Sequence, residues 1–318
     1  MLLESLLSLL RESATLTRQI QHDFITPTTW EKKDKSPVTV GDLAVQTLMA
    51  ARLEQLCPEI PLVAEESTEV LESDEGERFG EILRRYLEPF LGKFTRENMV
   101  HWIARGKEGT GTSRFWTLDP IDGTKGFLRR EQYATALALV EENRVTMGFL
   151  GLPNYTQGEN LVHAVRGKGT WANDLWKPGE WKACHVSEHR DVQEATVLRS
   201  VESGHTNLSQ MDILVRNLGV VREPVRMDSQ AKYAVLASGK SDFLFRLISA
   251  KQPHYKEKIW DQAAGSIILE EAGGKVTDLD GKDLDFSHGE TLEENRGICA
   301  SNGILHNIAL DAIIETGC

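Results

Sequence analysis

Two aspartates three residues apart follow a short apolar run, and their type and spacing could support chemistry. The segment 116–127 reads WTLDPIDGTKGF, with Asp119 and Asp122 on either side of a proline and an isoleucine. Two converging carboxylates repel each other, so a hard divalent cation such as Mg²⁺, which takes oxygen ligands, is the expected partner. Gly123 and Thr124 then offer backbone N–H groups and a hydroxyl suited to an anion. Turn and cap chemistry is the competing interpretation of this segment alone.

Three more acidic positions could join this site. Glu65 follows a short apolar strand, Asp261 comes shortly before the run AAGSIIL, and Asp42 stands early in a predicted helix. Each has an ordinary structural alternative, because acids favour helix N-termini and aspartate is a good capping residue. Taken singly, none of the three identifies a site. They would form one only if the fold brought all five carboxylates together.

The elements that must position these acids alternate along the chain. Helical spacing predicts helices over residues 2–22, 38–56, 79–90, 211–218, 231–238, 260–272 and 304–315. Strands are predicted over residues 60–64, 115–118, 133–140, 145–150, 161–165, 169–172, 195–200, 221–227, 243–247 and 273–281. Because Pro120 cannot donate to a strand ladder, we expect the strand before it to end there, with Asp119 at its terminus. The mixture predicts an α+β or α/β protein with covering helices.

Composition narrows the classes of protein. The 318 residues are 40% hydrophobic and carry a formal net charge of -12, with a pI near 5.3. This balance disfavours nucleic-acid and anionic-membrane partners, which select basic surfaces. No apolar run approaches the ~20 residues that span a bilayer, and the N-terminal segment is predicted to be a core helix rather than a signal peptide. Scattered cysteines without a C-x-x-C pair indicate reduced thiols, so a cytoplasmic location is expected.

Three of these segments, in their order along the chain, resemble the motifs of the inositol monophosphatase superfamily of lithium-sensitive, metal-dependent phosphomonoesterases. They are AEES at 64–67, DPIDGT at 119–124 and WDQAAG at 260–265. Ala64 stands where many members have glycine, which leaves the neighbouring carboxylate in place. The resemblance covers nearly the whole chain. It implies a layered α-β-α-β-α sandwich of the sugar-phosphatase type.

One branch of that superfamily, the 3′(2′),5′-bisphosphate nucleotidases, resembles the sequence more closely. The segments that carry this resemblance are SPVTVGD at 36–42, TKGFLR at 124–129, SVESGH at 200–205, DSQAKY at 228–233 and YKEKIWD at 255–261. It implies hydrolysis of the 3′-phosphate of adenosine 3′,5′-bisphosphate to AMP and phosphate, a reaction linked to sulfur metabolism. The 2′,5′ isomer and 3′-phosphoadenylyl sulfate are further expected substrates. Inositol phosphates, including inositol 1,4-bisphosphate, are the alternative, and a non-catalytic nucleotide or metal sensor is the alternative from another class.

The resemblance also implies which residues bind metal. Glu65, Asp119 and the carbonyl of Ile121 would hold one Mg²⁺. Asp119, Asp122 and Asp261 would hold a second, with Asp119 bridging the two, and a third, weaker ion would lie near Glu65. Inhibition by Li⁺ follows from the same resemblance, with Na⁺ and Ca²⁺ as further candidate inhibitors.

Catalytic and substrate contacts are implied in the same way. Asp42 and Thr124 would form the dyad that activates the attacking water. The residues expected to contact the substrate are Gly123, Thr124, His205, Ser229, Lys232, Arg246 and Asp261. Two of them have structural alternatives: Arg246 could form an internal ion pair within its apolar strand, and Lys232 could be solvated on its helix. The segment 248–254 departs from the branch pattern, which leaves the balance between free nucleotide and sulfonucleotide open.

A polar stretch near residues 175–195 predicts a boundary within the chain. We expect an N-terminal α+β subdomain, residues 1–185, to carry the main metal site. A C-terminal α/β subdomain, residues 186–318, would carry the nucleotide-binding residues. The expected assembly is a monomer or a weak homodimer.

Overall fold

The computed structural model describes residues 1–318 except 24–28, 32–36, 202–207 and 250–251. Its α-helices are α1 (Leu2–Asp23), α2 (Val40–Leu56), α3 (Glu69–Glu72), α4 (Gly76–Leu91), α5 (Arg96–Ala104), α6 (Thr124–Leu128), α7 (Leu208–Leu218), α8 (Ala231–Ala237), α9 (Ala263–Glu271) and α10 (His306–Thr316). Short 3₁₀ helices are η1 (Arg105–Lys107) and η2 (Val192–Glu194). Among the residues described, no helix is both long and apolar enough to cross a membrane.

The strands form a small hairpin and two larger sheets. The hairpin pairs β1 (Thr29–Glu31) with β2 (Pro37–Thr39). The seven-stranded sheet runs in sequence order through β3 (Leu62–Ala64), β4 (Arg114–Asp122), β5 (Ala134–Glu141), β6 (Arg144–Gly151), β7 (Leu161–Val165), β8 (Thr170–Asn173) and β9 (Lys182–Cys184). The five-stranded sheet has the order β11 (Val225–Arg226), β10 (Val197–Arg199), β12 (Phe243–Arg246), β14 (Ile298–Ser301) and β13 (Lys275–Thr277).

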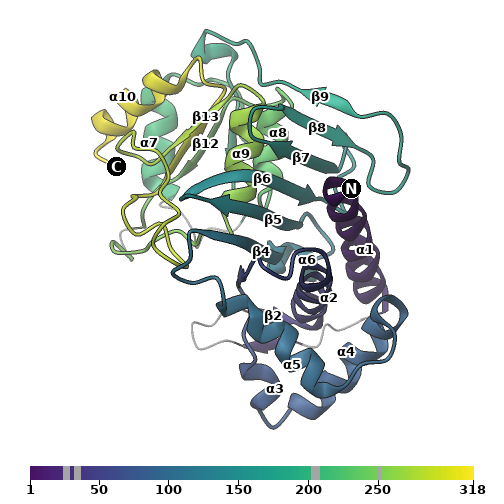
Figure 1. Ribbon diagram of the computed structural model, residues 1–318. Helices are drawn as coiled ribbons and strands as arrows, with labels where there is room; N and C mark the ends of the chain where they lie inside the picture. Colours follow the sequence, from purple (N-terminus) through teal and green to yellow (C-terminus); the bar gives the residue numbers. More distant parts are fainter. Residues whose placement is uncertain (24–28, 32–36, 202–207, 250–251) are drawn as a thin grey trace.

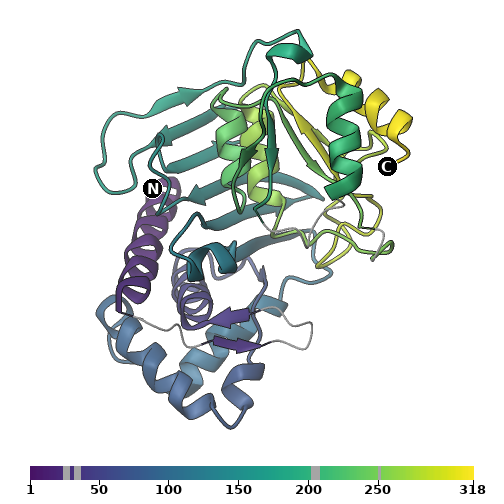
Figure 2. The same ribbon diagram turned by 180° about the vertical axis from the view of Figure 1, so that it is seen from behind.

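Helices and sheets stack in five layers (Figures 1 and 2). Helices α1 and α2 cover one face of the seven-stranded sheet, and α8 and α9 lie between that sheet and the five-stranded one. Helices α7 and α10 cover the outer face of the five-stranded sheet. The predicted α-β-α-β-α sandwich is therefore confirmed. The first sheet ends at Cys184 and the second begins at Val197. The division into subdomains at residue 185 remains a prediction.

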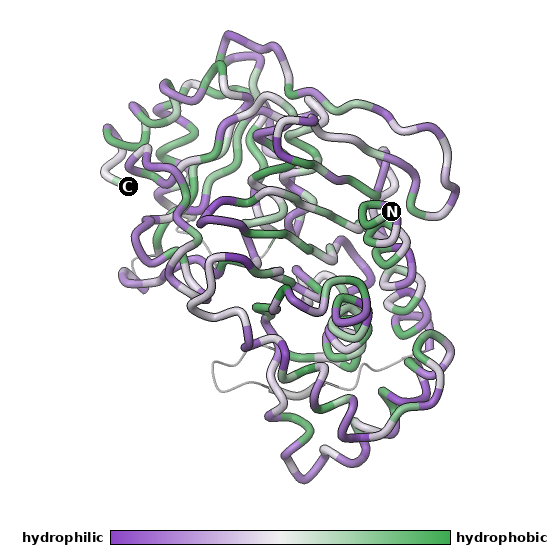
Figure 3. Tube along the Cα trace, in the orientation of Figure 1, coloured by the Kyte–Doolittle hydropathy of each residue, from purple (hydrophilic) through white to green (hydrophobic). Residues whose placement is uncertain are grey.

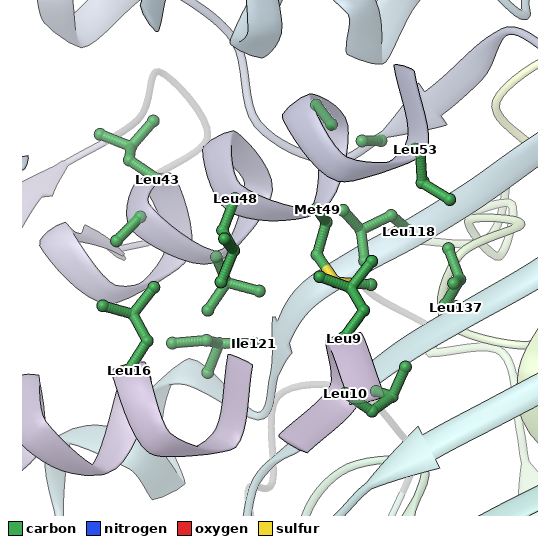
Figure 4. Close-up of a cluster of buried hydrophobic side chains, with 14 of the residues drawn as sticks. Leu9, Leu10, Leu16, Leu43, Leu48, Met49, Leu53, Leu118, Ile121 and Leu137 are labelled. Carbon is green, nitrogen blue, oxygen red and sulfur yellow. The ribbon is translucent and has the colours of Figure 1, made fainter. Parts of the chain in front are cut away.

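Strand alternation explains why both faces of the first sheet are buried. In β5, Leu137 and Leu139 belong to the core under α1 and α2, whereas Ala136 and Ala138 belong to the core facing α9. Figure 3 shows hydrophobic residues gathered in the sheets and the helices that pack on them. Figure 4 shows the first core, where Ile121 lies among the leucines of α1 and α2.

Strand β4 extends beyond Pro120, where we expected it to end. Pro120 lies inside the strand, and the ladder with β5 shifts register between Asp119, opposite Ala136, and Asp122, opposite Ala134. The prediction that the strand stops at Pro120 is therefore wrong, because a β-bulge absorbs the missing donor. Residues three apart in a regular strand face opposite sides, but the extra residue of the bulge returns both aspartates to one face.

Other predicted elements differ from the structure mainly at their ends. Several short elements were not predicted: α3, α5, α6, β1, β2, β9 and β14. The strand expected over residues 221–227 is reduced to Val225–Arg226. Helix α9 begins at Ala263, not at residue 260, so Asp261 stands in the turn before it. This later start places the acid outside the regular helix, where its carboxylate can face the end of β4.

Helix α9 approaches β6 so closely that only glycine fits at position 148. A Cβ there would lie 2.4 Å from Ile267 Cγ2 and 2.8 Å from the Ala264 carbonyl oxygen. We expect Gly148→Ala to destabilise the protein by about 1–3 kcal/mol, because the helix or the strand must move. Gly80→Ala in α4 is the matched control, since its Cβ would make only an ordinary 3.7 Å contact with Met99. Urea denaturation measures both, and equal stabilities would contradict the prediction.

Candidate active site

Glu65 and Asp119 lie side by side because their strands are parallel neighbours. Ala64 pairs with Leu118, and the Glu65 N–H donates to the Leu118 carbonyl at 3.3 Å. The next residue on each strand is one of the predicted metal ligands. Asp119 is only 2% exposed. The carboxyl end of β3 and the bulged end of β4 thus bring two acids from distant parts of the chain to one edge.

A buried glutamine fixes the chain just after Glu65. Gln46 of α2 is fully buried, and its side-chain amide donates to the Glu66 carbonyl at 2.8 Å. Its amide oxygen accepts from the Glu66 N–H at 2.9 Å. Both main-chain groups of Glu66 are therefore held by one side chain, which leaves the direction of β3 little freedom at the site.

Asp42 uses its two carboxylate oxygens for different partners. Oδ2 accepts from the N–H of Thr39 at 2.7 Å and from its hydroxyl at 2.6 Å, which completes a capping box at the start of α2. Oδ1 lies 3.3 Å from the hydroxyl of Thr124, which is also 3.1 Å from the Ile121 carbonyl oxygen. The contacts with Thr39 support the structural role of Asp42 as part of a helix cap, and the contact with Thr124 supports its predicted catalytic role. The cap locks the carboxylate that faces Thr124.

The turn after Asp122 is shaped by a residue in the left-handed region. Gly123 has φ 86° and precedes the short helix α6. Its neighbour across the site is Ser229, which has φ 64° and is buried. A Cβ on Gly123 would lie 3.2 Å from Ser229 Cβ. The structure therefore brings two predicted substrate contacts together across the boundary between the two halves of the chain.

Asp261 approaches from the layer between the sheets. The N-cap position of α9 is Gln262, so Asp261 is not the helix cap that its sequence context favoured. Gln230, just before α8, connects this turn to β4. Its backbone N–H donates to Asp122 Oδ2, and its side-chain amide donates to the carbonyl of Trp260 at 2.8 Å.

The five carboxylates share one electrostatic environment. Burial raises the pKa of Asp119 well above its ordinary value, and the charges of Glu65, Asp122, Asp261 and Asp42 raise it further. Burial followed by the charges of Asp122 and Glu65 raises the pKa of Asp261 in the same way. Within the described chain, no three acidic, histidine or cysteine side chains meet closely enough to form a ready-made ligand set for one ion. Mutual repulsion opposes such a convergence.

Two cations lie beside the acids. Lys232 is 7% exposed, and its Nζ donates to the Met227 carbonyl at 3.3 Å. Burial lowers the pKa of Lys232 to about 8, although the charge of Asp122 opposes this. The alternative of a solvated Lys232 is therefore wrong. Arg246 forms an ion pair with Glu257, from Nη2 to Oε2 at 3.0 Å and from Nε to Oε1 at 3.3 Å. The internal ion pair anticipated as an alternative role for Arg246 is present.

The residues fit a hard divalent cation. Among the described residues, Asp119 Oδ1 is a buried oxygen without a hydrogen-bond partner. The available donors are carboxylate and carbonyl oxygens, which Mg²⁺ prefers. Burial also raises the pKa of Asp122, against the opposing charges of Lys232 and Arg246. A cation at this edge would relieve the repulsion that raises these pKa values.

Sequence patterns identified the acids but missed the residues that hold them. Gln230 and Glu257 lie within segments 228–233 and 255–261, which carry the resemblance, but no role was expected for either of them, and Gln46 lies in none of the quoted segments. Their contacts reveal what all three residues hold. His205 lies outside the described residues, as do positions 250 and 251 of the segment that departs from the branch pattern.

The five-layer sandwich with acids gathered at one sheet edge defines a sugar-phosphatase-like class of fold. The chain belongs to the inositol monophosphatase family, because the sequence model of that family matches residues 3–316. Among solved structures, the IMPase of Thermotoga maritima has a TM-score of 0.69 at 24% identity, covering 99% of this chain and 97% of its own. The suhB protein of Bartonella henselae has a TM-score of 0.69 at 20% identity, covering 98% and 97%.

Two curated relatives are more similar in sequence. A 3′(2′),5′-bisphosphate nucleotidase of Dictyostelium discoideum is 40% identical over 306 residues, which cover 92% of this chain and 90% of the relative. A 3′(2′),5′-bisphosphate nucleotidase of Oryza sativa is 38% identical over 328 residues, covering 95% and 90%. The family match over residues 3–316 extends across both sheets.

The raised carboxyl pKa values predict how stability depends on pH in the absence of metal. Below the unfolded-state pKa near 3.8, the contribution of Asp119 is fully present, and it is lost as pH rises through the raised folded-state pKa. In EDTA, the wild type should therefore lose stability more steeply with rising pH than Asp119→Asn. Thermal unfolding at a series of pH values measures this difference. Asp74→Asn, at an exposed position, should follow the wild type, and parallel profiles for Asp119→Asn and the wild type would contradict the prediction.

Proposed function

We propose that this protein is a Mg²⁺-dependent phosphomonoesterase that removes the 3′-phosphate of adenosine 3′,5′-bisphosphate, giving AMP and phosphate. The 2′,5′ isomer and 3′-phosphoadenylyl sulfate belong to the same substrate class. The observation that carries the proposal is a cluster of buried and partly buried acids beside a buried lysine and a partly buried arginine, in a chain 40% identical to a 3′(2′),5′-bisphosphate nucleotidase. Acids alone serve any metal-dependent phosphatase, whereas the cations suit a substrate with a second phosphate.

The metal ligands follow from the acids at the edge of the sheet. Glu65, Asp119 and the Ile121 carbonyl would hold one Mg²⁺, and Asp119, Asp122 and Asp261 a second, with a weaker third ion near Glu65. Bound Mg²⁺ supplies an activated water and neutralises charge on the phosphate and the leaving oxygen. Inhibition by Li⁺, and by Na⁺ or Ca²⁺, would follow from occupation of the same positions.

Asp42 and Thr124 form the proposed water-activating dyad. The threonine hydroxyl donates to Asp42 Oδ1, so its lone pairs are left to accept a proton from water. As the water is deprotonated, the hydroxyl proton passes to Asp42. The capping box supports this role, because Thr39 occupies Oδ2 and fixes the orientation of Oδ1. The substrate phosphate would accept from the backbone N–H groups of Gly123 and Thr124.

The remaining substrate contacts come from the C-terminal half. Lys232, Arg246 and His205 supply positive charge for the second phosphate, and Ser229 and Asp261 contact the sugar end of the substrate. Burial of Lys232 supports an anion contact, because a buried ammonium gains more from an anionic partner than a solvated one does. The Arg246–Glu257 pair leaves Arg246 held in one orientation, which suits a fixed anion position.

The proposal also covers the partners and the location. A small nucleotide is the expected ligand, rather than nucleic acid or a membrane, in agreement with the net charge of -12. Cys57, Cys184, Cys299 and Cys318 are all free thiols, which supports a reducing compartment such as the cytoplasm. A monomer or weak homodimer remains the expected assembly.

Substrate preference tests the proposal directly. We expect kcat/KM for adenosine 3′,5′-bisphosphate to exceed that for inositol 1,4-bisphosphate and inositol monophosphate at the same Mg²⁺ concentration. Phosphate release measures all three, with Asp122→Asn as the inactive control. A markedly higher kcat/KM on the inositol phosphates would contradict the nucleotidase assignment and favour an inositol phosphatase. Nucleotide binding without phosphate release on any substrate would indicate a sensor.

The dyad predicts a specific effect of losing one hydroxyl. Thr124→Ala should lower kcat by about 10²-fold or more, because general-base activation of the water is lost. Thr124→Ser keeps the hydroxyl and should retain most of the activity. Steady-state kinetics at saturating Mg²⁺ separates the two variants. If Thr124→Ala turned over within a few-fold of the wild type, the dyad would have to be abandoned.

A further inference from the structure

Gln230 lies buried where helices α8 and α9 meet the end of β4. It is 2% exposed, and its two side-chain polar groups and its backbone N–H each have a partner near the site. The side-chain Nε2 donates to the Trp260 carbonyl at 2.8 Å, and Oε1 accepts from the N–H of Gly265 at 2.9 Å. The backbone N–H donates to Asp122 Oδ2 at 2.5 Å. One residue therefore connects strand β4 with both ends of the turn that begins α9.

The groups that Gln230 contacts are the ones that place Asp261. The Trp260 carbonyl belongs to the peptide unit that leads into Asp261, and Gly265 lies in the first turn of the following helix. The side-chain amide thus holds the chain before and after Asp261. The backbone of the same residue holds Asp122, whose charge is among those that raise the pKa of Asp261. The distance between these two like charges is constrained through Gln230.

We propose that Gln230 is a positioning residue that holds Asp122 and Asp261 at the separation required to share a divalent cation, so that its side chain sets the affinity of the site for that cation. This inference rests on the proposed metal-dependent function. Gln230 does not reach the metal or the substrate in this role. It acts through the peptide groups on either side of Asp261, because a partner of a ligand fixes that ligand's orientation.

Close packing of α8 on α9 explains why a side chain can transmit this constraint. Tyr233, three residues after Gln230, lies against Gly265 so closely that a Cβ there would be 2.2 Å from its ring. The Tyr233 hydroxyl also donates to the Gln262 side chain at 2.7 Å. These contacts hold α8 against α9 independently of the Gln230 amide, so we expect loss of that amide to free mainly the turn at Asp261.

The test compares Gln230→Met with Asn302→Leu. The first variant keeps the length of the side chain and loses both of its hydrogen bonds. Asn302 is the matched control, a buried amide that donates to the carbonyl of His189 and the hydroxyl of Ser187 and accepts from the N–H of Leu305. None of these partners adjoins the acids. Mn²⁺ binding without substrate, followed by electron paramagnetic resonance, is the main measurement.

We expect Gln230→Met to bind Mn²⁺ about tenfold more weakly than the wild type or Asn302→Leu. Both variants should lower the melting temperature in EDTA. The Mg²⁺ concentration for half-maximal activity should rise for Gln230→Met, whereas kcat at saturating Mg²⁺ should fall much less. If Gln230→Met does not fold, Gln230→Asn, which keeps the amide but shortens its reach, should weaken Mn²⁺ binding in the same direction.

Two results would overturn this inference. One is wild-type Mn²⁺ affinity in the Gln230 variant, and the other is an equal loss of affinity in Asn302→Leu, which would make the effect a general result of lost stability. The proposed function fails separately, in the wild type alone, if that protein neither binds Mn²⁺ nor hydrolyses the nucleotide. Failure of the inference therefore appears only in the comparison of variants.

Discussion

Repulsion between buried carboxylates is the constraint on which the rest of this structure depends. Asp119 is buried at the end of a strand, and four other acids raise its pKa. Such a cluster opposes folding on its own, since each charge is removed from water near others of the same sign. The surrounding layers supply the free energy that holds it together, through three apolar cores that bury both faces of both sheets.

Neutral amide side chains anchor the main chain beside two of the acids, Glu65 and Asp261. The Gln46 side chain forms hydrogen bonds with the N–H and the carbonyl of Glu66, next to Glu65. The Gln230 side chain forms hydrogen bonds with main-chain groups on either side of Asp261. Amides are neutral, so they add no charge to a site where charge is already in excess. A hydrogen bond to the main chain takes up no carboxylate oxygen, so it does not compete with a cation.

Local patterns in the sequence predicted the helices, the strands and the candidate acids, whereas the layered sandwich was implied by the family resemblance; the structure explains where such patterns stop. The helix over residues 2–22 and the hairpin of β5 and β6 follow from periodicity alone. The prediction that the strand ends at Pro120 was wrong, because a β-bulge depends on the pairing of two strands and cannot be recognised in one segment alone. The partners of Gln230 depend on the packing of α8 against α9, and Arg246 in β12 pairs with Glu257 in the irregular segment that follows it; spacing within a motif reveals neither.

Asp261 follows the other four acids by more than a hundred residues in the sequence, and this order has a consequence for folding during synthesis. A polypeptide emerging from the ribosome presents Asp42, Glu65, Asp119 and Asp122 long before α8 and α9 exist. Until Lys232 and the helices between the sheets emerge, the first sheet has an uncovered alanine-lined face and an acid edge without its neighbouring cation. Long-range contacts of this kind close slowly. The site should therefore be completed only after α8 and α9 have emerged, however early the first sheet assembles.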